Sequence, residues 1–470
     1  MSFLTIKFFT LFLIVFYIYW NVGARAKRAL ILIASCIFYS FFSFNFLLHF
    51  LFIIFVNYLF IRYLREKDSF LKISIGFNLA NLFLFKYFYF FLETIGYISG
   101  IEILTHKTLL NQYFSNLTHF ANFEVVLPAT ISYYTFQLIS LSVDLKKGEI
   151  HELISFYDVA SYVLFFPVMI AGPITRFKDI VPKMEEPILS REDMREGIWK
   201  ILLGITKKVA LSDSITTIIY PVFKEPENYS GLSILLTSYF FAIHLYLDFS
   251  GLTDIARGLG RLLGYNLPEN FKAPFLLNSF SDFWRRWHLS FSFWIRDYIY
   301  IPLGGSRVSE WRGYFNLLIT FILGGLWHGA SMNFMMWGFL TGLFLSLERF
   351  FELKQIKILP ENKFKPFIKY LFVLHVYMIS WILFFTTSLK AGFTVIWRVL
   401  TMKDGFPIGN LELGIYVTIF GMLFQLSEEY PEKFQWIQKI KPALLPIFSF
   451  IIVLLILNNS GNKDFFYEKF

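Results

Sequence analysis

The chain has 470 residues, of which 56% are hydrophobic and only 16% are charged, whereas an ordinary soluble domain carries about 25% charged residues. Its mean hydropathy of +0.55 excludes a mainly water-soluble protein and predicts a membrane protein. The formal net charge of +9 is spread over short loops between apolar segments, so it indicates membrane topology and argues against nucleic-acid binding.

Apolar segments recur along the whole chain, and a helix that crosses a bilayer needs about 20 apolar residues. The pattern predicts an all-α polytopic membrane protein with roughly 11–12 transmembrane helices, together with re-entrant or interfacial helices. The predicted helices are 3–22, 29–43, 46–64, 70–92, 125–143, 198–220, 231–249, 313–329, 332–350, 368–388, 409–427 and 443–459.

The loops after the first and third apolar segments are basic, carrying Arg25, Lys27 and Arg28 in one and Arg62, Arg65, Lys67 and Lys72 in the other. Basic loops face the cytoplasm. The acidic segment 93–124 is then an outside loop. Continued alternation predicts that both the N-terminus and the C-terminus lie outside the cytoplasm, in a bacterial inner membrane.

Two segments do not read as simple spans. Residues 156–176 contain Pro167 and a Gly172-Pro173 turn, and residues 275–305 mix tryptophan, arginine, aspartate and histidine among aromatic residues. Irregular backbone at membrane depth is tolerated only where protein or a water-filled cavity surrounds it. Both segments are therefore expected to be re-entrant or interfacial pieces that line a site.

His328 is the clearest functional candidate, because an ionisable side chain inside an apolar segment is costly. It lies in ILGGLWHGAS, preceded by Gly324 and Gly325 and followed by Gly329. A helical side chain leans over the preceding turn, so the imidazole is expected to face a flank left open for a ligand. The alternative is that Gly325 and Gly329 form a helix-packing face and His328 only bonds a neighbour.

A second cluster is SFSDFWRRWHLSFSFWIRDYIYIPLGG, beginning at residue 279. As a helix it would put Trp284, His288, Phe291 and Ile295 on one apolar face. Arg285 and Arg286 suit the phosphates of a coenzyme or pantetheine-bearing donor, since guanidinium forks match phosphate. They could equally be interfacial anchors.

Other signals are weaker. Asp248 and Asp254 are expected to mark the end of one helix and the start of the next, as caps or partners of Arg257. The glycines at 258, 260 and 264 follow no strand, which argues against a dinucleotide site. The sequence has no G-x-S-x-G and no H-E-x-x-H motif, and its single cysteine, Cys36, excludes cysteine metal sites, so no metal is expected.

Together these motifs resemble the membrane-bound O-acyltransferase family, in particular its alginate O-acetyltransferase-like bacterial branch. The resemblance implies a single domain over 1–470 in which helices surround a central tunnel with a cytoplasmic donor entrance and an outward funnel. Its parts would be 1–124, a catalytic core 125–350, helices 351–459 and an extracytoplasmic tail 460–470. The segments that carry the resemblance are LPATISYYTFQLISLSVD (127–144), FFPVMIAGPITR (165–176), LDFSGLTDIARGLGRLLGYNLPENFKAPF (247–275), FWRRWHLSFSFWIRDYIYIPLGG (283–305) and LGGLWHGAS (323–331).

The resemblance also implies roles for particular residues. His328 would be the essential catalytic residue and His288 its companion. Apart from the resemblance, Arg285, Arg286 and Trp327 are expected to bind the donor, and Gly324, Gly325 and Asp248 are expected to line the site.

The last six residues, FFYEKF, fit a terminal pattern of these systems in which the tyrosine, here Tyr467, is a transient acyl carrier. A phenol of pKa about 10 needs a base such as His328 to become a nucleophile. The alternative is an aromatic tail that rests at the membrane interface.

The expected function is O-acetylation of an extracytoplasmic glycan, alginate-like or another cell-envelope polymer, from a cytoplasmic acetyl-CoA or acyl-carrier thioester. No bound cofactor is expected. The partners would be the lipid bilayer, the thioester donor, the glycan and a periplasmic acetyltransferase of the SGNH type. The alternatives are D-alanyl transfer to teichoic acid, a non-enzymatic polysaccharide channel or exporter, and a purely structural subunit.

Overall fold

The computed structural model describes residues 3–64, 67, 69–118, 124–184, 187–357, 363–386, 388–436, 439–440 and 444. Within these residues all extended regular structure is helical, and one isolated bridge joins Tyr229 and Phe406. The predicted all-α polytopic membrane fold is thereby confirmed. Six described helical stretches are long and apolar enough to span a bilayer: Phe44–Tyr63, Ser69–Ser99, Gly231–Leu262, Met332–Leu353, Lys365–Phe385 and Leu411–Glu429.

The chain divides into two compact units, which we describe separately. The smaller unit comprises residues 28–170 and 176–182, and the larger comprises residues 1–27, 171–175 and 183–470. All the candidate site residues that the structure describes belong to the larger unit.

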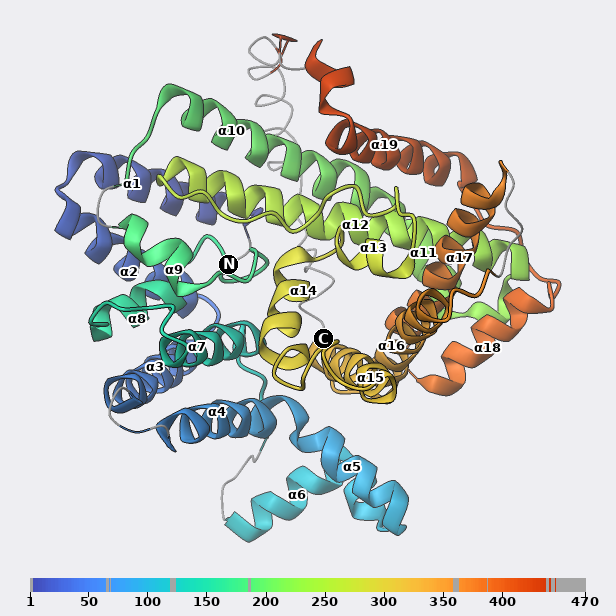
Figure 1. Ribbon diagram of the computed structural model, residues 1–470, viewed down its shortest axis with the longest axis horizontal. Helices are drawn as coiled ribbons and strands as arrows, with labels where there is room; N and C mark the ends of the chain where they lie inside the picture. The colour runs from blue at the N-terminus through green and yellow to red at the C-terminus, as the bar shows by residue number, and fades with distance from the viewer. Residues whose placement is uncertain are drawn as a thin grey trace. The chain divides into compact units, whose positions relative to one another are not determined.

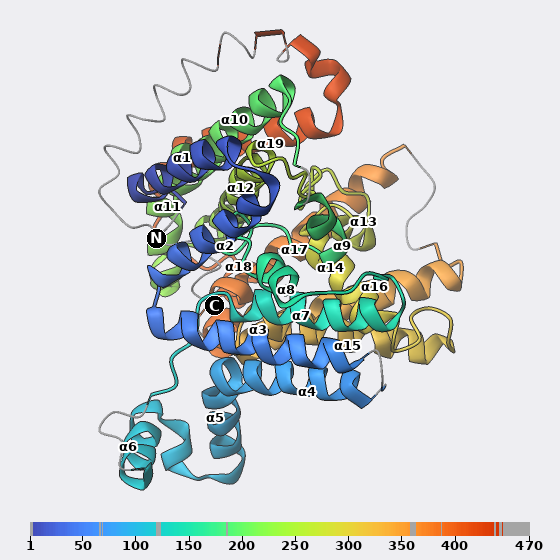
Figure 2. The same ribbon diagram turned by 90° about the vertical axis from the view of Figure 1, so that its left-hand side faces the viewer.

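In the smaller unit, α3, α4 and α7 lie side by side (Figure 2) and are joined by buried polar side chains. Asn57 and Asn78 exchange side-chain hydrogen bonds, and the Ser74 and Ser142 hydroxyls lie 2.9 Å apart. Such bonds hold apolar helices together where water is absent. The helices of this unit are α2 (Ala24–Ser40, mostly here), α3 (Phe44–Leu64), α4 (Ser69–Leu82), α5 (Phe88–Ser99), α6 (Lys107–Thr118), α7 (Ile131–Lys146), α8 (Phe156–Val163) and α9 (Phe177–Ile180).

The larger unit holds the remaining helices, with π-helical turns η4 (Thr206–Ser212) and η7 (Arg296–Tyr300) between them. Its α-helices are α1 (Ile6–Asn21), α10 (Arg191–Ile205), α11 (Thr216–Lys224), α12 (Gly231–Leu262), α13 (Phe280–Trp284), α14 (Leu289–Ile295), α15 (Glu310–His328), α16 (Met332–Leu353), α17 (Lys365–Phe385), α18 (Leu389–Leu400) and α19 (Leu411–Glu429).

Helix α12 is longer than the predicted 231–249, because its glycines pack against another helix and do not end it. A Cβ atom on Gly204 of α10 would lie 2.3 Å from the carbonyl oxygen of Gly251, and one on Gly258 would lie 2.6 Å from that of Gly197. The two helices run along each other (Figure 1) with their backbones in close contact.

The prediction that Asp248 and Asp254 stand at helix ends is wrong, since both lie inside α12. Their carboxylates pair with two successive lysines of η4, Lys208 at 2.6 Å and Lys207 at 2.9 Å. A buried carboxylate needs such a cation, so these charges join α12 to the segment that follows α10. The predicted single helix 198–220 is divided into α10, η4, the 3-10 turn η5 (Asp213–Ile215) and α11.

The two irregular segments are not simple spans, as predicted. Residues 156–176 form the short α8 followed by turns, and residues 275–305 contain α13, α14 and η7. Helices α6 and α18 were not predicted, and the predicted helix 443–459 lies almost entirely outside the described residues.

Candidate active site

His328 is the last residue of α15, and its side chain is buried, with the residue only 5% exposed. The rings of Trp337 and Phe384 each lie 5.4 Å from the imidazole centroid, and that of Phe291 lies at 5.1 Å. An aromatic shell of this kind keeps water from the imidazole.

The open flank predicted beside His328 is not present, because other parts of the protein fill it. A Cβ atom on Gly324 would meet the ring of Phe291 at 3.2 Å, and one on Gly325 would lie 2.1 Å from the carbonyl oxygen of Phe334 in α16. Gly325 therefore serves close helix packing, while Gly324 admits the aromatic ring that also contacts both histidines.

His288 stands at the N-terminus of α14 with φ 43° and ψ 56°, in the left-handed region. The segment therefore does not form the single helix considered above: α13 ends at Trp284 and α14 begins at Leu289. Both aromatic residues and His288 are nevertheless buried. A left-handed non-glycine residue costs about 1–3 kcal/mol and persists only where its surroundings hold it.

Residue Asn270 supplies much of that support. Its backbone oxygen accepts from Leu289 N at 2.9 Å, and its side-chain oxygen accepts from the Ser290 N–H at 3.2 Å and from the Ser290 hydroxyl at 2.6 Å. The backbone N–H of Lys272 also donates to the carbonyl oxygen of Arg286. These bonds fix the backbone on both sides of His288.

The structure brings the two histidines together. Their ring centroids are 6.2 Å apart, and the ring of Phe291 lies 5.0 Å from His288. Trp327 packs against both imidazoles, at 4.9 Å from His328 and 6.1 Å from His288. Burial lowers the pKa of His288 to about 3, so this imidazole is neutral near pH 7. A neutral imidazole can accept a proton from a hydroxyl group.

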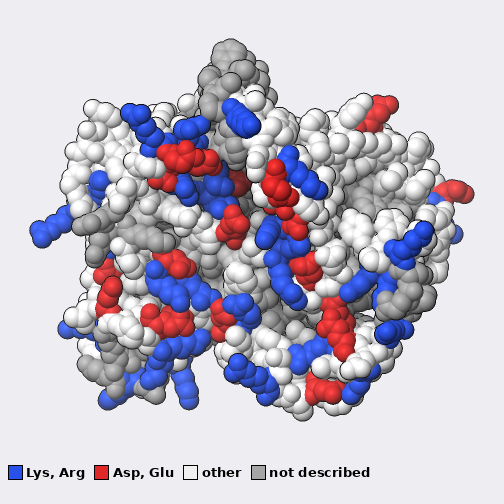
Figure 3. All heavy atoms as spheres, turned by 45° about the horizontal axis from the view of Figure 1, so that its top comes forward, with Lys and Arg blue, Asp and Glu red and all other residues white. Residues whose placement is uncertain are grey.

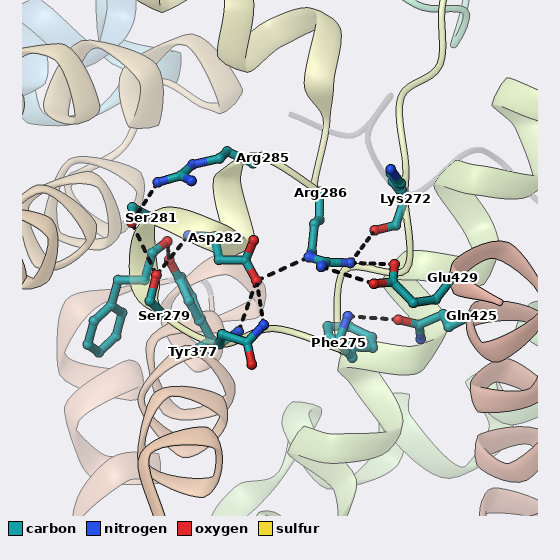
Figure 4. A network of polar contacts seen from close by, with 12 residues as sticks. Lys272, Phe275, Ser279, Ser281, Asp282, Arg285, Arg286, Tyr377, Gln425 and Glu429 are labelled. Carbon is teal, nitrogen blue, oxygen red and sulfur yellow. Dashed lines mark hydrogen bonds and ion pairs between the residues drawn. The ribbon is translucent and has the colours of Figure 1, made fainter. Parts of the chain in front are cut away.

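The paired arginines differ from one another (Figure 4). Arg286 is held by Asp282 at 3.1 Å and by Glu429 at 2.7 Å, whereas Arg285 is exposed and donates to the Ser281 hydroxyl at 3.3 Å. Arg286 thus has an intramolecular role before any donor binds. Asp248, expected to line the site, directs its carboxylate to Lys208 at 2.6 Å.

A polar cavity of about 430 Å³ lies beside the His288 shell. Its lining includes Ser250 and Asn270, whose buried Oγ and Nδ2 atoms find no hydrogen-bond partner among the described residues. Phe271 also lines the cavity and packs on Phe249, which in turn contacts the His288 ring at 4.7 Å. The charged lining residues are Glu196, Lys200, Lys207, Asp254, Arg257, Glu269, Lys272 and Glu428.

Sequence reasoning missed several of these residues. Lys207 and Lys208 were available as a signal, because two adjacent lysines inside the predicted helix 198–220 are costly in an apolar segment. Asn270 gave no local signal, since a loop asparagine is ordinary.

In the described part of the chain no group of three histidine, cysteine or acidic side chains could hold a metal ion. Acidic and basic side chains lie interspersed on the face shown in Figure 3.

Tyr467, the predicted acyl carrier, lies outside the described residues.

Comparison with known proteins assigns the chain to one family. The sequence model of the membrane-bound O-acyltransferase family matches residues 100–389, which include both histidines. The probable alginate O-acetylase AlgI of Pseudomonas aeruginosa is 33% identical over 450 residues, which cover 91% of this chain and 82% of that protein. The probable alginate O-acetylase AlgI of Pseudomonas putida is 34% identical over 398 residues, which cover 82% of this chain and 77% of that protein. The peptidoglycan O-acetyltransferase of Helicobacter pylori is 32% identical over 287 residues, 54% of each chain.

Proposed function

The chain belongs to the membrane-bound O-acyltransferase family, and from that membership we propose that it transfers an acetyl group from a cytoplasmic thioester to a hydroxyl group of an extracytoplasmic polysaccharide. It is a multi-pass membrane O-acyltransferase. The proposed location is the inner membrane of a bacterium, with both chain termini outside the cytoplasm.

The observation that carries the proposal is the pair of buried histidines, 6.2 Å apart inside one aromatic shell. In the proposed reaction His328 takes the proton of the acceptor hydroxyl as its oxygen attacks the thioester carbonyl carbon. A C–O bond forms, the C–S bond breaks, and the proton passes to the departing sulfur to give a thiol. The uncommitted Nδ1 of His288 can stabilise charge that develops on the carbonyl oxygen.

The donor is proposed to approach through the polar cavity. Its basic lining residues Lys200, Arg257 and Lys272 suit the phosphates of a coenzyme or phosphopantetheine, and the buried orphan groups of Ser250 and Asn270 suit the amides of a pantetheine arm. Arg285, which is exposed, remains a proposed ligand of the donor phosphates. Arg286 is proposed to shape the rim of the cavity, because carboxylates hold its guanidinium in place. Trp327 is proposed to contact the acyl end near His328.

The acceptor is proposed to be an alginate-like or other cell-envelope glycan, in line with the names of the relatives. Transfer is direct, or it runs through the phenol of Tyr467, which would then pass the acetyl group to a periplasmic acetyltransferase of the SGNH type. Mass spectrometry of the protein after incubation with acetyl-CoA and no acceptor tests the relay. Absence of acetyl-Tyr467, with full activity of Tyr467→Phe, would dispose of it.

The function itself is tested with the purified protein in liposomes, labelled acetyl-CoA, and alginate or peptidoglycan as acceptor. We expect label in base-labile esters on one glycan or on the protein. Label supplied only by a D-alanyl carrier protein would favour D-alanyl transfer. No label from either donor, with the glycan still crossing the membrane, would replace the proposal by an exporter.

A further inference from the structure

The last turns of α19 hold the segment that carries His288, although α19 lies beyond the residues matched by the family model. Three polar side chains on one face of this helix, at positions i, i+3 and i+4, reach into that segment; Figure 4 shows two of them, Gln425 and Glu429. Gln425 accepts from the Phe275 N–H at 2.7 Å, and Glu428 accepts from the Ala273 N–H at 3.1 Å. Glu429 binds the Arg286 guanidinium with both carboxylate oxygens, at 2.7 and 3.3 Å.

These contacts meet needs of the backbone that the loop cannot meet itself. Ala273 is fully buried in the left-handed region with φ 44°, and Phe275 is buried as well. A buried N–H without an acceptor costs about 1–3 kcal/mol. The side chain of Gln425, a residue 0% exposed, is costly to bury, and its acceptor bond from the Phe275 N–H offsets that cost.

Hydrogen bonds, joined by short stretches of backbone, connect α19 to the neighbours of His288. Glu428 and Gln425 fix residues 273 and 275; the same loop bonds the Arg286 carbonyl through Lys272 N. Asn270, at its start, bonds the backbone of residues 289 and 290. The strained left-handed conformation of His288 is thus held from both sides by a loop whose own position depends on α19.

We propose that Gln425, Glu428 and Glu429 are positioning residues for His288, acting through residues 270–275 and Arg286. The role assigned to His288 rests on the proposed function. The link between α19 and the His288 backbone does not, and it can be measured without any reaction.

The test compares Gln425→Met, which keeps the length and volume of the side chain but removes the acceptor, with Gln425→Glu, which keeps an acceptor oxygen. Val417→Ala is the matched control, because it removes buried methyl groups from the same helix two turns away. Hydrogen exchange read by mass spectrometry on the full-length protein is followed for peptides covering residues 270–276 and 284–292. Acetyl transfer is measured over a range of acetyl-CoA concentrations, which gives both kcat and KM.

We expect Gln425→Met to speed exchange in both peptides at least tenfold and to lower kcat about tenfold or more, with the KM for acetyl-CoA changed less than twofold. Gln425→Glu should recover most of both effects. Val417→Ala should leave both readouts near wild type even where it lowers the melting temperature.

Unchanged exchange at residues 284–292 in Gln425→Met would overturn the positioning role. So would a loss in Val417→Ala equal to that in Gln425→Met, because the effect would then be general loosening of α19. If the wild-type protein transfers no acyl group but Gln425→Met still exchanges faster than wild type, the proposed function is wrong and the link from α19 to His288 remains supported.

Discussion

Replacing Gly325 by alanine should move His328 and slow the reaction. A Cβ atom at this position would lie 2.1 Å from the Phe334 carbonyl oxygen, and Cβ atoms essentially never lie within 3.0 Å of such an atom. Helices α15 and α16 must therefore separate locally by about 0.9 Å, the difference between these two distances. A Cβ atom on Gly338 would likewise lie 2.2 Å from the Phe321 carbonyl oxygen, so a sideways shift of the two helices offers little relief.

His328 lies one turn beyond Gly325 on the same helix, and its aromatic shell includes Trp337 of α16. A misplacement of about 1 Å can slow a reaction about 10²-fold, and overpacking of a tight interface costs about 1–3 kcal/mol. We expect Gly325→Ala to retain a folded, monodisperse protein and to lower kcat about 10²-fold, measured as transfer from labelled acetyl-CoA in liposomes.

Gly313→Ala is the matched control on α15. Its added Cβ would meet the Arg349 guanidinium at 3.5 Å, an ordinary contact, and alanine favours a helix by about 1 kcal/mol over glycine. Its activity should stay within twofold of wild type. Activity of Gly325→Ala within threefold of this control would refute the argument that the α15–α16 contact positions His328.

Two further predictions concern buried charge. Lys207→Met leaves Asp254 and Glu428 without their shared cation. The free energy of unfolding, followed by thermal unfolding in detergent, should fall by about 3–5 kcal/mol, and adding Asp254→Leu should recover part of this loss. Wild-type stability of the single variant would contradict the prediction. Because the pKa of His288 is lowered to about 3, the ¹⁵N resonances of its ring should report a neutral imidazole at pH 5. The resonances that disappear in His288→Gln identify this ring. A titration midpoint of the ring near pH 6.5 would contradict the prediction. Since unfolded histidine has a pKa of about 6.5, the unfolded chain binds the extra proton between about pH 3 and 6.5, and the free energy of unfolding should fall by about 2 kcal/mol from pH 6.5 to 5.

The elements that the sequence predicted well are those with long apolar runs. Helices α15 and α16 begin and end within about three residues of their predictions. The end of α12 was predicted too early because Gly251 and Asp254 are ordinary signals of a helix boundary. Both residues are helical because α10 packs its own glycines against α12 and the lysines after α10 pair with the buried carboxylates. Tertiary contacts outweighed local preference there.

The residues of the site also differ in how far the sequence alone could predict them. His328 was singled out by its cost in an apolar helix, and the structure brings it beside His288, whose importance came from the family resemblance. The left-handed turn at His288 depends on Asn270, 18 residues away, and on Gln425 far along the chain. No local pattern reports hydrogen bonds across such separations, so the loop that holds His288 could not be predicted.

The most direct test of the account replaces His328 by glutamine and follows acetyl transfer from labelled acetyl-CoA to glycan or protein. His375→Gln is the matched control, because His375 is an exposed histidine on α17 whose ring nitrogen lies 2.8 Å from the Leu371 carbonyl oxygen. We expect a loss of about 10²–10⁴-fold in kcat for His328→Gln, with the control near wild type and both proteins folded. Transfer by His328→Gln within tenfold of His375→Gln would contradict the catalytic role of His328.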